Sequence, residues 1–223
     1  ASDVYKRQIH YFVNGTWSAN RLVDDVWSEY YTAIRAANLY LKEAEGQTFE
    51  DWENAEKYKD MMKEFNNFPY EVRFLRAFYY FELIKRYHDV PLVTTVLTQD
   101  EVNSLERESC DLVADFIIKE LTEITAEGKL PITYTEGFAS KDIGRITRGA
   151  ALALKSRVTL YMASPLYSED NAGKWKKAAS AAYEIIGNVS ELGYELVDDL
   201  TAQFRKVNNT CLLYTSPSPR DRG

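Results

Sequence analysis

The chain has 223 residues, of which 45% are hydrophobic and 27% are charged, so it can bury a real core and is unlike a disordered polypeptide. Its formal net charge is −7, and its lysines and arginines form no cluster. This argues against a nucleic-acid groove or an anionic membrane surface as a partner, and we expect no nucleic acid to bind. No segment is apolar over the roughly 18 residues that a membrane-spanning helix needs.

The two cysteines, Cys110 and Cys211, are too few for a disulfide framework, and no Cys/His spacing of a metal site occurs. Cys110 falls in a segment with helical spacing. We therefore expect it to be a packed free thiol.

Both ends of the chain lack the apolar spacing seen elsewhere. The tail, TSPSPRDRG, has the composition of a disordered linker and also resembles translated sequencing-adapter sequence, as does the head. We predict a head over residues 1–8, a helical domain over residues 9–207 and a tail over residues 208–223. On this interpretation the chain is a fragment of a longer protein, and the alternative is a pair of flexible termini.

Six segments have apolar residues at steps of three and four, which predicts amphipathic helices. They run over residues 24–45, 49–65, 69–87, 110–126, 147–163 and 174–186. Pro69 suits the first position of the third helix, and Pro91 is expected to begin an extended stretch to Leu97. With no strand alternation, the fold class is all-α. Pairing the helices in order gives tetratricopeptide-like helix pairs with long loops.

Several positions in these helices carry specific expectations. Asn38 lies in an apolar stripe and is expected to be a buried amide bonded to a neighbouring segment rather than a ligand contact. His88 ends a helix and is expected to take the positive φ that such exits often need. Four basic residues on an otherwise apolar helix should reach solvent or carboxylates, and these are Arg73, Arg76, Lys85 and Arg86.

Two apolar stripes are expected to pack inward. The stripe of the second segment is formed by Trp52, Ala55, Met62 and Phe65. The stripe of the last segment is formed by Trp175, Ala179, Ala182 and Ile186. Helical spacing of aromatic residues is usually explained by core packing.

No motif for catalysis is present: the chain lacks GxSxG, HExxH, a P-loop and GxGxxG, and it has only two histidines. Its adjacent acidic pairs would not face one another on a helix, so they form no acid/base dyad. We predict that the protein is not an enzyme, holds no metal and needs no cofactor.

One loop before the first helix has the residue types of a sugar site. An aromatic face holds the apolar side of a sugar ring, while amides and a guanidinium bond its hydroxyls. The predicted glycan-binding residues are Asn14, Trp17, Asn20 and Arg21. The alternative is that Trp17 packs on the core beside the first helix.

A second candidate loop runs over residues 132–143. Tyr134 and Phe138 are the aromatic residues that this loop could expose to a ligand. We expect this loop to be the weaker candidate of the two.

Residues 70–92, YEVRFLRAFYYFELIKRYHDVPL, resemble the signature helix of the SusD/RagB family, whose usual form is Gly-Glu-x-Arg-Phe-Leu-Arg-Ala followed by Tyr-Gly-Asp-Val-Pro-Leu. Three other segments agree in order and spacing, namely residues 27–38, residues 144–154 with 161–163, and residues 175–182. The resemblance covers residues 9–207. The chain departs from the pattern at Tyr70 and His88, which both stand where the family has glycine.

The resemblance implies a lipid-anchored nutrient-binding protein at the cell surface, on the outer membrane of Bacteroidetes-type bacteria. It implies an oligosaccharide or other nutrient as ligand and a SusC-type TonB-dependent transporter as partner. Neither Cys110 nor Cys211 stands where a lipid anchor would, so we expect the anchor to lie outside this sequence. Much of the family's ligand site is also expected outside it.

Two other hypotheses stay open. A tetratricopeptide-like adaptor would bind a protein or peptide in a groove lined by helices rather than by aromatic loops. A carbohydrate-active enzyme would need two carboxylates brought together from distant loops, which sequence spacing does not test.

Overall fold

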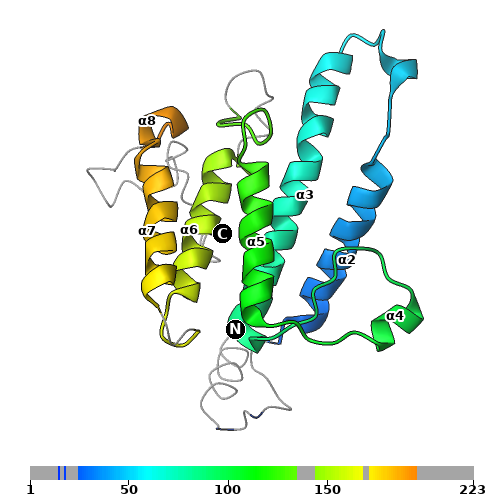
Figure 1. Cartoon of the computed structure of the whole chain (residues 1–223). Coiled ribbons are helices and arrows are strands. Elements are labelled where there is room, and N and C mark those ends of the chain that lie inside the picture. The colour runs from blue at the N-terminus through cyan, green and yellow to red at the C-terminus, as the bar shows by residue number, and fades with distance from the viewer. Residues whose placement is uncertain (1–14, 16–17, 19–24, 135–143, 168–170, 195–223) are drawn as a thin grey trace, which may run out of the picture.

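The computed structural model describes residues 15, 18, 25–134, 144–167 and 171–194. Its elements are all helical (Figure 1), and β assignments among the described residues are limited to single bridge positions, such as the bridge between Val90 and Glu108. This confirms the all-α prediction. The elements are α2 (Trp27–Ala44), η1 (Glu50–Trp52), α3 (Tyr58–Tyr87), α4 (Gln99–Asn103), α5 (Cys110–Ile124), α6 (Arg148–Met162), α7 (Ala172–Ile186) and α8 (Val189–Leu192).

The long helices lie side by side in chain order (Figure 1): α2 packs on α3, α3 on α5, α5 on α6, and α6 on α7. This is the predicted arrangement of tetratricopeptide-like pairs. The core runs along α3, where Tyr80, Phe81 and Leu83 are fully buried, and continues into α5 through Ile117 and Leu121. The apolar faces of neighbouring helices thus pack against one another and form one continuous buried layer.

The prediction of separate helices over 49–65 and 69–87 is wrong. Residues 58–87 form the single 30-residue helix α3 with Pro69 inside it. Residues 49–57, the first part of the predicted second helix, form only the short η1 and turns. Pro69 has no N–H to donate to the carbonyl of Phe65, which costs about 3 kcal/mol in a helix interior. Aromatic contacts hold the first turns in place despite this, because Phe65 packs edge-on against both Phe49 and Phe68.

Side-chain caps fix where two helices begin. The Ser109 hydroxyl accepts a hydrogen bond from the Leu112 N–H at 3.3 Å, and the Thr147 hydroxyl accepts one from the Ala150 N–H at 3.3 Å. Ser109 stands directly before the helix, and serine is among the residues preferred at this capping position. Cys110 follows it, buried and free, and burial raises the pKa of its thiol to about 11, which makes it unreactive.

His88 ends α3 with φ +62°, the one positive value among the non-glycine residues that the structure describes. The expected positive φ is confirmed. Its ring stacks on Tyr167 and its Nδ1 lies 2.8 Å from Asp89 Oδ1, so side-chain contacts stabilise a backbone conformation that glycine adopts more easily.

A buried polar network joins α2, α3 and α5 to the extended stretch after Pro91. Asn38 Nδ2 donates to the carbonyls of Val93 (3.0 Å) and Thr95 (3.2 Å), and Arg76 donates to Asn38 Oδ1 at 2.7 Å. The same guanidinium donates to Glu120 at 2.7 Å. The expectations for Asn38 and Arg76 are therefore confirmed, and the network fixes where residues 91–97 cross the two helices.

The other basic residues of α3 also meet carboxylates. Arg73 donates to both oxygens of Glu120, at 3.1 and 2.8 Å, and Lys85 and Arg86 both pair with Glu82. Charge-assisted bonds of this kind offset the desolvation of partly buried ions.

Acid should destabilise the fold through these carboxylates. Burial alone would raise the pKa of Glu120, but hydrogen bonds from Arg73 and Arg76 outweigh it and hold that pKa below its ordinary value of 4.5. The pKa of Glu82 is lowered in the same way by Lys85 and Arg86. A group with a depressed folded-state pKa contributes stability that is complete above about pH 4.5 and is lost as the pH falls through the folded-state pKa.

We therefore expect the urea midpoint to stay level between pH 7 and 5 and to fall steeply below pH 4.5. Urea titrations followed by circular dichroism at each pH measure this. A Glu120→Gln variant should have a lower urea midpoint at pH 7, and this midpoint should fall less between pH 5 and lower pH. A fall in midpoint equal to that of the unsubstituted chain would contradict the assignment to Glu120.

The inward stripe predicted for α7 is wrong. The face buried against α6 carries Ala178 and Ala181, whereas 46% of Trp175 and 67% of Ile186 are exposed. Two apolar stripes run along α7 one position apart, and the alanine stripe lets the helices approach more closely. The larger residues Trp175, Tyr183 and Ile186 thus form an exposed outer face on α7. This helix is the last long helix in the row (Figure 1).

We expect this outer face to make the chain self-associate, because exposed large apolar side chains at helical spacing favour association. Replacing Trp175, Tyr183 and Ile186 together by glutamine should shift the chain toward monomer in size-exclusion chromatography with light scattering. The matched control replaces two exposed apolar residues elsewhere, Val102 and Leu105, by glutamine. An equal shift in the control would contradict the role given to α7.

Candidate functional site

The predicted glycan-binding residues Asn14, Trp17, Asn20 and Arg21 lie outside the described residues, where only Gly15 and Ser18 of this loop are placed. The predicted loop site therefore stays a prediction.

The expectation that Tyr134 is exposed is wrong. Its side chain is buried, its hydroxyl donates to Glu71, and the Arg145 guanidinium lies 5.3 Å from its ring centroid. Arg145 also donates to both oxygens of Glu71, at 3.1 and 3.0 Å. Tyr134 thus closes a polar contact between the loop and α3 rather than offering a face to a ligand; Phe138 lies outside the described residues.

A hollow of about 420 Å³ opens instead between η1 and the first turns of α3. We call it the aromatic pocket. Its wall is almost entirely apolar and aromatic, with one carboxylate. The lining residues are Phe49, Trp52, Tyr58, Met61, Met62, Glu64, Phe65 and Phe68.

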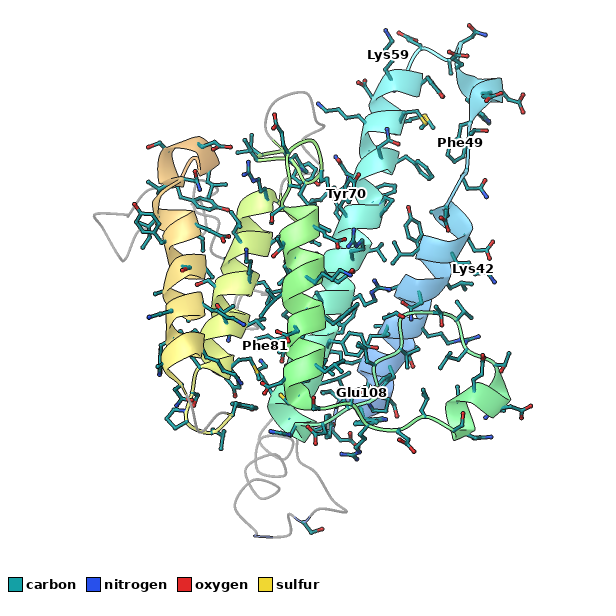
Figure 2. All side chains as sticks on the ribbon, viewed as in Figure 1. Lys42, Phe49, Lys59, Tyr70, Phe81 and Glu108 are labelled. Atoms are coloured by element: carbon teal, nitrogen blue, oxygen red, sulfur yellow. The ribbon has the colours of Figure 1, made fainter. Side chains whose placement is uncertain are left out.

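The aromatic pocket lies at the outer end of the first helical pair. There η1 and the start of α3 project beyond the end of α5 (Figure 1). Phe49 belongs to the segment that joins α2 to α3 and lies beside the first turns of α3 (Figure 2). The Trp52 side chain is 61% exposed and Met61 is 54% exposed. A ligand could therefore reach the pocket from solvent and contact a tryptophan ring.

Short backbone turns place Trp52 at this rim. Gly46 with φ +73° lets the chain leave α2, and Trp52 N–H then donates to the Phe49 carbonyl at 2.9 Å. Ala55 N–H donates to the Trp52 carbonyl at 2.8 Å, and Tyr58 N–H to that of Ala55 at 2.9 Å. These successive turns carry the chain into α3 and leave the indole outside the core.

The inward packing expected for Trp52 is thus wrong, because η1 ends at this residue and no helix carries its stripe onward. One signal in the sequence could have indicated exposure. Trp52 stands in the run Glu50-Asp51-Trp52-Glu53, and three charges in four residues is a density typical of the protein surface.

Two further hollows fit a sugar less well. A groove of about 540 Å³ runs between α2 and residues 91–105, but its tryptophan, Trp27, is already covered by Arg107 and by the edge-on ring of Tyr87. A hollow of about 650 Å³ near Gly128 has no aromatic wall, and Arg148 in it is paired with Glu191 at 2.8 Å.

The aromatic pocket supplies the two contacts that sugar rings use. Aromatic faces contact the apolar C–H side of the ring, and carboxylate oxygens accept hydrogen bonds from hydroxyls. In the part of the chain that the structure describes, no three His, Cys, Asp or Glu side chains group as a metal site. None of the described helices is both long and apolar enough to span a membrane.

Comparisons with known proteins identify the family of this chain. The family model SusD-like_3, described as starch-binding and associating with the outer membrane, matches residues 3–160. A curated relative, the SusD-like protein P25 of Formosa agariphila, is 26% identical over 164 residues, which is 74% of this chain and 26% of that protein.

Two solved structures are also similar. A SusD-like protein from Bacteroides fragilis has 34% identity and a TM-score of 0.60, with 81% of this chain and 29% of that one covered. A laminarin-binding SusD-like protein has 28% identity and a TM-score of 0.61, with 82% and 35% covered. This chain therefore belongs to the SusD-like family. It spans about a quarter to a third of the length of these relatives.

Proposed function

We propose that this protein binds an oligosaccharide through the aromatic pocket, with Trp52 as the surface on which a sugar ring stacks. The observation that carries the proposal is an exposed tryptophan at the rim of an open, aromatic-walled hollow of about 420 Å³. Family membership supports it, as does the laminarin-binding relative. A stacked ring would lie between Trp52 and the aromatic side chains of α3.

Affinity electrophoresis in gels cast with polysaccharides tests the binding. We expect at least one polysaccharide to retard the chain, and bovine serum albumin run beside it to migrate unchanged. No retardation by any member of a broad panel would contradict the proposal.

We further propose that the whole protein lies at the surface of the outer membrane, held by a lipid anchor, and delivers its ligand to a SusC-type TonB-dependent transporter. The family description, outer-membrane association, supports this location. Pull-down of the full-length protein from outer membranes, followed by mass spectrometry, should recover such a transporter. A pull-down without any TonB-dependent transporter would count against it.

The same proposal makes the protein a binder and not a catalyst. We expect no new reducing ends when the full-length protein is incubated with a polysaccharide that it retains. Release of oligosaccharides would show an enzyme instead.

The loop with Asn14, Trp17, Asn20 and Arg21 is proposed as a second sugar contact, on its residue types alone. A Trp17→Ala variant should weaken retardation by a bound polysaccharide without lowering the melting temperature. A lower melting temperature with unchanged retardation would favour the alternative, in which Trp17 packs on the core.

A further inference from the structure

The charges around the aromatic pocket point to the class of glycan that it accepts. We infer that carboxylates at the pocket make it selective for uncharged glycans over those that carry uronate or sulfate groups. The inference rests on the proposed function, since it concerns the same site. We call Glu50, Asp51 and Glu64 the carboxylate rim.

Glu64 of the carboxylate rim lines the pocket, and Glu50 and Asp51 stand in the chain between two lining residues, Phe49 and Trp52. Glu50 and Asp51 are exposed and directly precede Trp52 in η1, and Glu64 lines the pocket wall. Residues 42–64 carry eight carboxylates against four lysines, so the whole outer end of the first helical pair is acidic. A bound anion would meet like charge here.

The lysines on α3 do not offset this charge at the pocket. Lining residues of α3 recur at steps of three and four, so they share one face of the helix. At 100° per residue, Lys59 and Lys63 lie about 140 to 180° around the helix from the centre of that face. Lys59 is seen at the outer end of α3 (Figure 2).

The guanidinium behind the pocket is already matched by acids. Arg145 lies 4.8 Å from the ring centroid of Phe68, which lines the pocket, but it bonds both oxygens of Glu71 and lies 3.9 Å from Glu64. A sulfate or uronate would have to break these pairs to gain a cationic partner. Arginine is the side chain best suited to such groups, so its engagement by Glu71 weakens the case for an anionic ligand.

Carboxylates favour a neutral sugar for a second reason. A carboxylate oxygen accepts hydrogen bonds from sugar hydroxyls, which donate, whereas it accepts nothing from another carboxylate or from a sulfate. The same three side chains therefore accept hydrogen bonds from the hydroxyls of a glycan but repel the anionic groups that only charged glycans carry. Repulsion between exposed charges is modest and is screened by salt, so the discrimination should be largest at low ionic strength.

The test uses a glycan array that carries uncharged glucans, xylans and mannans beside alginate, polygalacturonate and sulfated galactans, probed with the whole chain at low salt. We expect the bound members to be uncharged. For one bound glucan, a partly oxidised form of the same backbone, bearing uronates, should bind about 2- to 5-fold more weakly. That ratio should shrink in 0.5 M NaCl.

A Glu50→Gln/Asp51→Asn variant should reduce the ratio of the affinity for the glucan to the affinity for its oxidised form. The control Glu106→Gln/Asp115→Asn removes the same charge elsewhere and should leave this ratio unchanged. Binding that favours alginate or a sulfated galactan and is lost in Trp52→Ala would overturn the inference and leave the proposed function standing. Failure to bind any member would overturn both.

Discussion

Replacing Trp52 by alanine should lower the affinity for a bound oligosaccharide by at least about tenfold, which corresponds to about 1.4 kcal/mol. The indole is the large exposed ring at the mouth of the aromatic pocket, and its removal takes away the face on which a sugar would stack. Because more than half of the side chain is in solvent, the fold should lose little stability. Isothermal titration calorimetry measures the affinity.

The chain contains its own control for this prediction. Trp175 is also exposed but lies on α7, at the opposite side of the row of helices (Figure 1). Trp175→Ala removes the same side chain and should leave the affinity unchanged. Equal losses in the two variants would mean that exposed tryptophans contribute unspecifically, and an unchanged affinity in Trp52→Ala would rule out the aromatic pocket as the site.

Replacing Glu120 by alanine should destabilise the chain by about 3–5 kcal/mol, the range measured when one partner of a buried ion pair is removed. The carboxylate accepts hydrogen bonds from Arg73 and Arg76 and has 8% of its side chain exposed. Without it, the Arg76 guanidinium stays buried against Asn38 with its charge uncompensated. A loss of this size is a large share of the 5–15 kcal/mol that typically stabilises a domain.

Urea unfolding followed by circular dichroism measures this loss, and Glu127→Ala, an exposed acid just beyond α5, is the control. Replacing Arg73, Arg76 and Glu120 together by leucine or methionine should restore part of the stability, since a well-packed apolar set avoids the desolvation of charges. A loss below about 1 kcal/mol in Glu120→Ala would mean that water reaches the network and screens it.

The sequence predicted most helices and their buried positions well, because apolar residues that face the core of a helical fold recur at steps of three and four. The spacing of apolar residues placed α2, α5 and α6 nearly to their ends, and an amide within an apolar stripe correctly indicated that Asn38 bonds a neighbouring segment. His88 was recognised from the backbone that a helix exit needs. Each of these features depends on local chemistry.

The errors arose where two patterns compete. Pro69 suits the start of a helix and is costly inside one, yet the aromatic contacts around Phe65 favour the continuous α3. On α7 the spacing of Trp175 and Ile186 and that of Ala178 and Ala181 are equally helical, and the packing distance to α6 selects the alanines. Periodicity gives the shape of a stripe but not the partner that covers it.

The candidate site was missed for a related reason. Trp52 was assigned to a helical stripe, whereas η1 ends there and the side chain points to solvent. A pocket formed between a turn and a helix has no sequence period of its own. Its residues come together only in the fold, where Phe49 and Trp52 face the first turns of α3.

The most direct test of the central claim, that oligosaccharide binds at the aromatic pocket, is hydroxyl-radical footprinting by mass spectrometry with and without a retained oligosaccharide. Oxidation of Trp52 and Met61 should fall several-fold when the sugar is bound, while oxidation of Trp175, which is also exposed, should stay the same in the same molecules. Protection of Trp175, or of Trp27 in the groove along α2, with Trp52 still oxidised as in the free chain would contradict the account.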